Sequence, residues 1–300
     1  IRTVTQASSL SISIDDNGGL LALGNPVAET TNKKTGKVSV FALDNNAWDM
    51  AMKAEDQEEA FTVDKEVAKF AAGDGFGYRV ALSGNGEYVA AIAPFAEAGV
   101  VYIVKKNGDT QRVQLKKGSV NIDRIYSAAL NYAGNILAVG ALLVKNTREV
   151  DPTEAEDAVS VADKGDKAGT VYLFEKTAQD GDVIWQYKHS IPAKEVGING
   201  YAVSLSAVSL SEGEGLLAIS NPIANDGRGD VYLYKLPIRD DATPIKLSDY
   251  NKDTSYLGFG ISIDLWHDTT VSGGKNMLSV EAFSYDNKKA ILYNYALDKN

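Results

Sequence analysis

The chain of 300 residues contains no cysteine and only two histidines, His189 and His267. Without cysteine, a disulfide framework, a thiol nucleophile and a cysteine-ligated zinc site are excluded. Neither histidine lies in a pattern typical of a Ser-His-Asp triad or a histidine-rich metal centre, so both are interpreted as surface or packing residues. A glycine-rich phosphate loop, a nucleophile elbow and a paired-carboxylate motif are also missing. We therefore expect a protein that is not an enzyme and that holds no cofactor, with calcium as the one ion to consider.

Basic residues and long apolar runs are scarce as well. The 30 lysines and arginines are outnumbered by 40 aspartates and glutamates, which gives a net charge of −10. This balance disfavours binding to nucleic acid or to anionic lipid through a basic surface. No apolar run approaches the roughly 20 residues that cross a bilayer, so direct membrane insertion is not expected. The start at Ile1 is neither an initiator methionine nor a signal peptide, and we interpret it as a processed N-terminus.

One pattern recurs five times along the chain. Each copy has an alternating apolar strand, a turn rich in Gly, Asn and Asp, and a second, almost continuously apolar strand. A variable loop, a strand rich in Val and Tyr, and a weaker fourth strand follow. The turns need the positive φ that Gly and Asn tolerate, and continuous apolar strands are typical of sheets covered on both faces. The copies cover residues 7–52, 75–115, 126–190, 200–247 and 258–300.

This repeat predicts an all-β fold, a single five-bladed β-propeller of four-stranded blades spanning residues 1–300. The last copy ends without a fourth strand, whereas the chain begins with Ile1-Arg-Thr-Val-Thr5, which resembles one. We therefore expect residues 1–6 to complete the last blade and close the ring, which would remove exposed sheet edges. Deletion of residues 1–6 should then destabilise the whole ring.

Two insertions interrupt the period, at residues 53–72 and 142–168. The first is predicted to hold a short helix. The second is strongly acidic, and Asp151, Glu154 and Asp157 are its candidate binding residues. Long loops on one face of a propeller commonly carry binding sites. The alternative is a solvated charged insertion without a ligand.

The fourth copy contains Arg228-Gly229-Asp230, the tripeptide that integrins bind. Short motifs of this kind are weak evidence of function. Gly229 also occupies the slot that Gly36 and Gly99 fill in other copies, immediately before the third strand. Both an adhesion motif and a purely structural repeat position therefore remain open.

Two further candidate sites come from residues that the repeat does not require. Asp15, Asp16 and Asp226 are candidate calcium ligands, because calcium prefers six to eight oxygen atoms. Ordinary turn chemistry is the alternative explanation for these aspartates. Trp266, followed by His267, lies outside the repeat consensus and is the best position for stacking on a sugar.

The repeats resemble the FG-GAP repeat β-propeller family, which includes the head of the integrin α-subunit. The resemblance rests on Phe76-Gly77 and Phe259-Gly260, on Ala90–Pro94, and on the diverged segment Ala22–Pro26. It covers almost the whole chain. It implies an extracellular, cell-surface or lumenal module for recognition or adhesion, and in some members a lectin. The Asp-x-Asp/Asn-x-Asp-Gly loops of that family are not matched here, so its calcium sites are not carried over.

Two functions are therefore expected from different classes. The first is a non-enzymatic protein-interaction or adhesion module, for instance a structural subunit of a surface assembly. The second is a carbohydrate-binding lectin. A hydrolase or lyase that uses the acidic insertion is a third and weaker reading. The partner would be a protein or a glycan, and the sequence does not determine the oligomeric state.

Overall fold

A computed structural model of the chain describes most of the predicted strands. The described residues are 11–30, 33–34, 36–42, 73–96, 100–106, 110–117, 120–122, 125–142, 169–179, 182–192, 205–211, 214–239, 242–248, 256–268, 274–284 and 289–297. Residues 1–6, the insertion at 53–72 and all of the acidic insertion except Leu142 lie outside this set. The predicted ring-closing strand and the candidate binding residues Asp151, Glu154 and Asp157 therefore lie outside the described residues.

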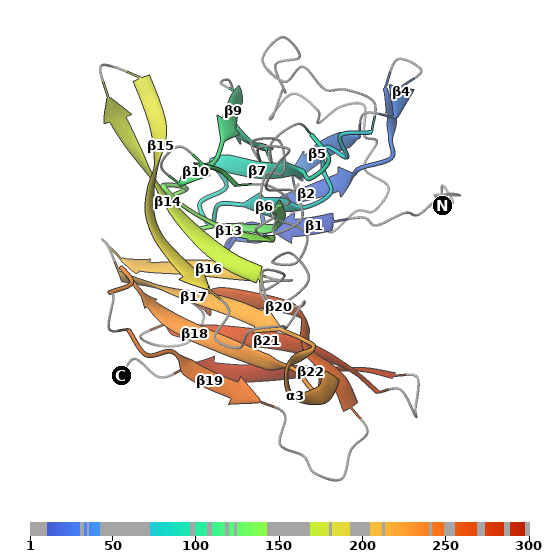
Figure 1. Ribbon diagram of the computed structural model, residues 1–300, viewed down its shortest axis with the longest axis vertical. Helices are drawn as coiled ribbons and strands as arrows, with labels where there is room; N and C mark the ends of the chain where they lie inside the picture. The colour runs from blue at the N-terminus through green and yellow to red at the C-terminus, as the bar shows by residue number, and fades with distance from the viewer. Residues whose placement is uncertain are drawn as a thin grey trace, which may run out of the picture.

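The described part of the chain is all-β and forms five antiparallel sheets of three or four strands (Figure 1). In each sheet the strands follow one another in chain order, so every sheet is a simple meander. The first sheet contains β1 (Ser11–Ile14), β2 (Leu20–Asn25) and β5 (Lys37–Ala42). The second contains β6 (Val80–Leu82), β7 (Tyr88–Ala93), β8 (Val100–Lys105) and β9 (Thr110–Gln114). The third contains β12 (Ile125–Leu130), β13 (Ile136–Leu142), β14 (Gly169–Gln179) and β15 (Asp182–Pro192).

The last two sheets complete the array. The fourth sheet contains β16 (Leu205–Ser211), β17 (Glu214–Asn221), β18 (Asp230–Leu236) and β19 (Ile245–Ser248). The fifth contains β20 (Tyr256–Asp268), β21 (Lys275–Ser284) and β22 (Lys289–Leu297). Two short ribbons pair β3 (Glu29–Thr30) with β4 (Lys33–Lys34) and β10 (Lys116–Lys117) with β11 (Val120–Asn121). In Figure 1 the first three sheets occupy the upper half of the molecule and the last two occupy the lower half.

Among the described residues, the hydrophobic core is divided into four clusters, and each lies between two sheets that follow one another in the chain. Strands in the middle of the array are therefore buried on both faces, as β7 and β8 show by burying five of their six residues. In β22 of the fifth sheet, exposed residues alternate with half-buried ones along most of the strand. Continuous burial thus marks strands that lie between two neighbouring sheets, and alternating burial marks a strand whose second face is not covered in this way.

Two junctions between sheets repeat the same backbone contact. Gly36, just before β5, lies against Phe76 at the start of the second sheet, and the two residues form an isolated parallel bridge. Gly229, just before β18, lies against Phe259 of the fifth sheet, whose amide donates a 2.8 Å hydrogen bond to the Arg228 carbonyl. A Cβ atom on either glycine would lie 2.1 Å from the carbonyl oxygen of the facing phenylalanine. Only glycine fits there, and this explains the glycine that precedes the third strand in these two copies of the repeat.

Candidate functional site

The array has two ends with different chemistry. We call the end with the turns between the first and second strands of each sheet the turn end. We call the opposite end, with the connections between second and third strands, the loop end. Because neighbouring strands run antiparallel, these two sets of connections lie at opposite ends of every sheet.

At the turn end, one side chain closes the turn in each of the first three sheets. The Asp15 carboxylate accepts a 2.8 Å hydrogen bond from the Leu20 amide. The Ser83 hydroxyl accepts the equivalent bond at 3.0 Å from Tyr88, and the Asn131 side chain accepts it at 2.9 Å from Ile136. Asp15, which the sequence predicted as a calcium ligand, is therefore a buried residue that caps its turn. Ser83 and Asn131 have the same structural role in the next two sheets.

Asp16 hydrogen-bonds to the second sheet and lies within electrostatic range of the fifth. Its amide donates a 3.0 Å hydrogen bond to the Gly84 carbonyl of the second sheet. Although the residue is partly exposed, loss of hydration raises the pKa of its carboxyl group. The neighbouring carboxylates Asp15 and Asp264 raise this pKa further, and His267 lowers it. Asp16 therefore lies within electrostatic range of His267, although the sequence had placed the two residues in separate candidate sites.

The other half of this turn end comes from the hairpin of β20 and β21. Nδ1 of His267 lies 2.9 Å from the Asn276 side-chain oxygen. Trp266 is half-buried and faces Met277 across the hairpin, so its ring is only partly available to a ligand. Among the described residues, no group of three or more His, Asp or Glu side chains is placed to hold a metal ion.

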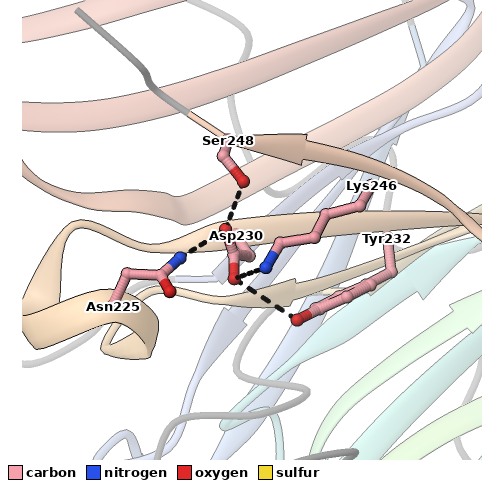
Figure 2. Close-up of polar contacts among 5 residues, drawn as sticks. All are labelled: Asn225, Asp230, Tyr232, Lys246 and Ser248. Carbon is pink, nitrogen blue, oxygen red and sulfur yellow. Dashed lines mark hydrogen bonds and ion pairs between the residues drawn. The ribbon is translucent and has the colours of Figure 1, made fainter.

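The Arg-Gly-Asp segment lies at the loop end of the fourth sheet, and its aspartate points inward (Figure 2). Asp230 is fully buried, and its carboxylate forms an ion pair with Lys246 at 2.8 Å. The Asn225 amide donates to it at 2.8 Å and the Tyr232 hydroxyl at 3.3 Å, while the Ser248 hydroxyl supplies another short hydrogen bond. These four donors occupy the carboxylate oxygens, so Asp230 is not presented to a partner at the surface.

The residues around this cluster follow from local backbone chemistry. Asn225 and Asp226 belong to the four-residue α3 (Ala224–Gly227) and adopt left-handed φ angles of 53° and 59°. Asn and Asp tolerate this conformation better than other non-glycine residues. The sequence had proposed Asp226 as a calcium ligand, and here it is an exposed turn residue. Arg228 is exposed, whereas Gly229 is buried against Phe259.

A structural feature that the sequence analysis missed lies in three of the loop-end turns. In the first, second and fourth sheets, a buried proline follows the second strand, and the residue after it is exposed and apolar. These exposed residues, here called the apolar tips, are Val27, Phe95 and Ile223, at 39%, 64% and 46% relative exposure. Turn tips usually carry Gly, Asn, Asp or Ser, so three apolar residues at equivalent tips are unusual. The signal available in the sequence was the repeated Pro-x-Ala motif with an apolar middle residue.

The tip of the second sheet belongs to a row of three aromatic rings, here called the aromatic row. The Phe95 ring lies 6.1 Å from that of Tyr78, and Tyr78 lies 6.4 Å from Tyr126, both pairs in edge-to-face arrangement. Tyr126 lies at a break in the β12–β13 register between Ile125 and Ser127. Bulges of this kind re-aim a side chain. The row therefore joins the second and third sheets with an exposed ring at one end.

Comparisons with known proteins find structural likenesses only at low sequence identity. No family model matches the chain, and no curated protein matches it. Among solved structures, a Pyrococcus horikoshii acylaminoacyl peptidase is 14% identical with a TM-score of 0.44, and the match covers 98% of this chain and 39% of that one. An acylaminoacyl peptidase bound to a chloromethyl ketone is 13% identical with a TM-score of 0.43, covering 99% and 40%. TolB from Acinetobacter baumannii is 10% identical with a TM-score of 0.39, covering 96% and 54%.

These matches are β-propeller-type proteins, and the chain spans about two fifths of the peptidases and about half of TolB. They do not identify the FG-GAP family, because no family model matches. One prediction was wrong. The sequence analysis expected that the chain is not an enzyme, yet two of the matched structures are enzymes. Catalytic groups on propeller-containing chains need not follow a short motif, so the missing motifs were not a sufficient ground for that prediction. No helix in the described part of the chain is long and apolar enough to span a membrane.

Proposed function

We propose that this chain is a protein-interaction module in which the loop end of a β-propeller binds a protein partner. The observation that carries the proposal is the set of apolar tips, Val27, Phe95 and Ile223, exposed at equivalent turns of three sheets. Apolar residues on a surface contribute most when a partner removes them from water, at about 25 cal/mol per Å² of buried area. Their repetition at one end of the array favours a binding role over chance, because an isolated exposed apolar residue is common on any surface.

We propose in addition that the five sheets are the five blades of an FG-GAP-type propeller, closed by residues 1–6 as the outer strand of the fifth sheet. The repeated junctions at Gly36 and Gly229 support a common blade-to-blade geometry. The interaction of Asp16 with Asp264 and His267 supports an approach of the first and fifth sheets at the turn end. A location outside the cell, on its surface or in a lumen is part of the same proposal, and the net charge of −10 is compatible with it.

The test compares the loop end with a matched surface elsewhere. The loop-end variant carries Val27→Asp, Phe95→Asp and Ile223→Asp. The control variant carries Tyr132→Asp at the turn end and Ile245→Asp on β19, two residues that are 43% and 60% exposed. Each protein is immobilised and incubated with an extract of its source cells, and bound proteins are cross-linked to it. The retained proteins are then quantified by mass spectrometry.

We expect a protein partner that the wild type and the control variant retain and the loop-end variant loses. Circular dichroism must show that both variants keep the wild-type fold. The proposal is refuted by a partner that the loop-end variant retains at the wild-type level, and equally by the lack of any protein retained above an unrelated β-sheet protein.

A further inference from the structure

We propose that the loop end of the fourth sheet binds a calcium ion through three oxygen-bearing side chains, Asn221, Asp230 and Ser248, here called the oxygen row. The Lys246 ammonium pairs with this row in the structure, and calcium competes with it for the Asp230 carboxylate. The inference goes beyond the proposed function and does not depend on it, because it concerns a buried polar cluster and not the apolar tips.

The oxygen row is aligned across three neighbouring strands. Asn221, the last residue of β17, lies directly opposite Asp230, the first residue of β18. Asp230 in turn lies directly opposite Ser248, the last residue of β19. Residues directly opposite one another on neighbouring strands project from the same face of a sheet, with Cβ atoms about 5 Å apart. The strand register therefore brings the oxygens of all three side chains together on one face.

Asn221 supplies the observation that points to a ligand. It is only 3% exposed, and its side-chain oxygen is buried without a hydrogen-bond partner. The first sheet has the same Asn-Pro-x-Ala motif, but there the Asn25 oxygen accepts a 3.3 Å hydrogen bond from the Val27 amide. Leaving a buried acceptor without a donor is costly. A cation bound to the oxygen row removes this cost at Asn221.

The chain itself already places a positive charge on the row. Nζ of Lys246 lies 2.8 Å from the Asp230 carboxylate (Figure 2). Asp230 is fully buried, whereas the Lys246 side chain is 39% exposed and can turn to solvent. A buried carboxylate needs a positive partner. A calcium ion provides that partner and also coordinates the Asn221 oxygen, which Lys246 leaves without one.

The donor set favours calcium among the common metal ions. Calcium is bound by six to eight oxygen atoms in flexible geometry, whereas zinc prefers sulfur and nitrogen and magnesium demands a near-ideal octahedron. The two Asp230 oxygens, the Asn221 amide and the Ser248 hydroxyl supply four ligands, and water supplies the rest. Because only one ligand is a carboxylate, we expect a weak site with a Kd of about 0.1 to 1 mM.

The repeat does not require the oxygen row. In the second sheet, the corresponding positions across three strands are Ala93, Val100 and Gln114. In the first sheet, Asn25 lies opposite Lys37. The glycine junction is nevertheless the same in the first and fourth sheets. The three aligned oxygens of the fourth sheet are therefore an addition to the common blade geometry, as expected for a ligand site.

The experiment titrates the whole chain with calcium chloride in a calorimeter and records thermal unfolding in calcium and in EDTA. Asn221→Ala removes the unpartnered oxygen, and Lys246→Met removes the competing ammonium but keeps the length of the side chain. The matched controls lie in other sheets. Asn25→Ala changes the same motif in the first sheet. Lys188→Met removes a lysine that is 43% exposed and lies 3.1 Å from Glu175.

We expect the wild type to bind one calcium ion at about 0.1 to 1 mM. Lys246→Met should bind calcium about tenfold more tightly and Asn221→Ala about tenfold more weakly, whereas both controls should stay within about twofold of the wild type. In EDTA, Lys246→Met should melt below the wild type, because its buried carboxylate has lost its partner. Calcium should restore the melting temperature of this variant.

Three results would overturn the inference. The first is the lack of saturable binding to both the wild type and Lys246→Met at about 10 mM calcium. The second is wild-type affinity in Asn221→Ala, which would place the ion elsewhere. The third is an equal gain in Lys246→Met and Lys188→Met, which would indicate general attraction to a more negative chain. The lysine variants decide the matter even if Asn221→Ala does not fold, because they test a gain of binding.

Discussion

The junction between the first and second sheets and the junction between the fourth and fifth sheets are two copies of one contact with different surroundings. The glycines have nearly the same φ, 89° at Gly36 and 90° at Gly229. Each glycine lies against the backbone of a phenylalanine, Phe76 or Phe259. The residues that follow the two glycines differ in burial: Lys37 is exposed, whereas Asp230 is fully buried. The repeat therefore specifies the backbone contact and leaves the next side chain free to vary.

This comparison explains the Arg-Gly-Asp tripeptide. The junction requires the glycine. The aspartate is required by its own polar cluster, in which it forms an ion pair with Lys246 of β19. Breaking a buried ion pair by removing one partner is costly, whereas replacing both partners often is not. The aspartate thus has a local structural reason to be present, and the motif need not signal adhesion. The following predictions, in order of decreasing effect, test how far the two junctions are equivalent.

The largest effect is expected from the glycines themselves. Gly36→Ala and Gly229→Ala each place a Cβ atom 2.1 Å from a carbonyl oxygen and force alanine to adopt a left-handed φ. We expect each variant to lose about 3 kcal/mol or more of the free energy of unfolding, measured by urea denaturation. Similar losses would show that the junctions are equivalent. A loss below about 1 kcal/mol in either variant would show that this junction relaxes easily.

The second effect separates the junctions. Asp230→Ala leaves Lys246, Asn225 and Tyr232 without their common acceptor, and we expect a loss of about 2 to 3 kcal/mol. The figure is at the lower end because the Lys246 side chain is 39% exposed and can turn to solvent. Lys37→Ala, at the corresponding position of the first junction, should change the free energy of unfolding by no more than about 0.5 kcal/mol. Equal effects in the two variants would contradict the distinction.

A smaller, pH-dependent effect is expected where the first sheet approaches the fifth. The pKa of Asp16 is raised in the folded state, first by loss of hydration and then by Asp15 and Asp264. The folded protein therefore binds this proton more tightly than the unfolded chain does. The resulting stabilisation is present below the ordinary carboxyl pKa and is lost as the pH rises through the raised value.

Asp16→Asn should accordingly stabilise the protein at neutral pH, by less than about 1 kcal/mol because the group is partly exposed. The gain should shrink as the pH falls through the raised pKa of Asp16, and it should be gone below the ordinary carboxyl value of about 4, where the wild-type carboxyl is protonated in the folded and the unfolded chain. Thermal unfolding of both proteins across this pH range measures the difference. A variant less stable than the wild type at neutral pH would show that the charge of Asp16 stabilises the fold. The surroundings of Asp16 would then not be the repulsive ones that its raised pKa implies.

The smallest effect on stability is expected at the apolar tips. Val27→Ser and Ile223→Ser change exposed residues at the first and fourth loop-end turns, so the melting temperature should stay within the equivalent of about 0.5 kcal/mol. A larger loss would mean that the tips pack against the protein and are part of the two junctions rather than a free surface. Differential scanning calorimetry of each variant next to the wild type is the measurement.

Strand positions were largely accessible from the sequence, because period-two alternation and glycine-rich turns are local signals. The continuous burial of β7 follows directly from its apolar residues, whereas β2 is equally apolar from Leu20 to Leu23 but is fully buried only at every second residue. The same reasoning located Gly229 as a repeat position. It did not find the apolar tips, because a single apolar residue in a turn is not periodic and becomes visible only when the equivalent turns are compared.

The sites were less accessible for a physical reason. Asp15 and Asp16 are adjacent in the chain, yet one caps a turn and the other faces the fifth sheet, and no local pattern separates these roles. The meeting of Asp16 with His267, the pairing of Asp230 with Lys246 and the row from Phe95 to Tyr126 all join segments of different strands. The amino-acid order alone settled the all-β class, the repeated strands and the need for glycine at the junctions, because these follow from neighbouring residues. Which polar groups are buried, which apolar ones are exposed and which side chains meet was decided by how the sheets pack, since only packing brings distant residues together and takes them out of water.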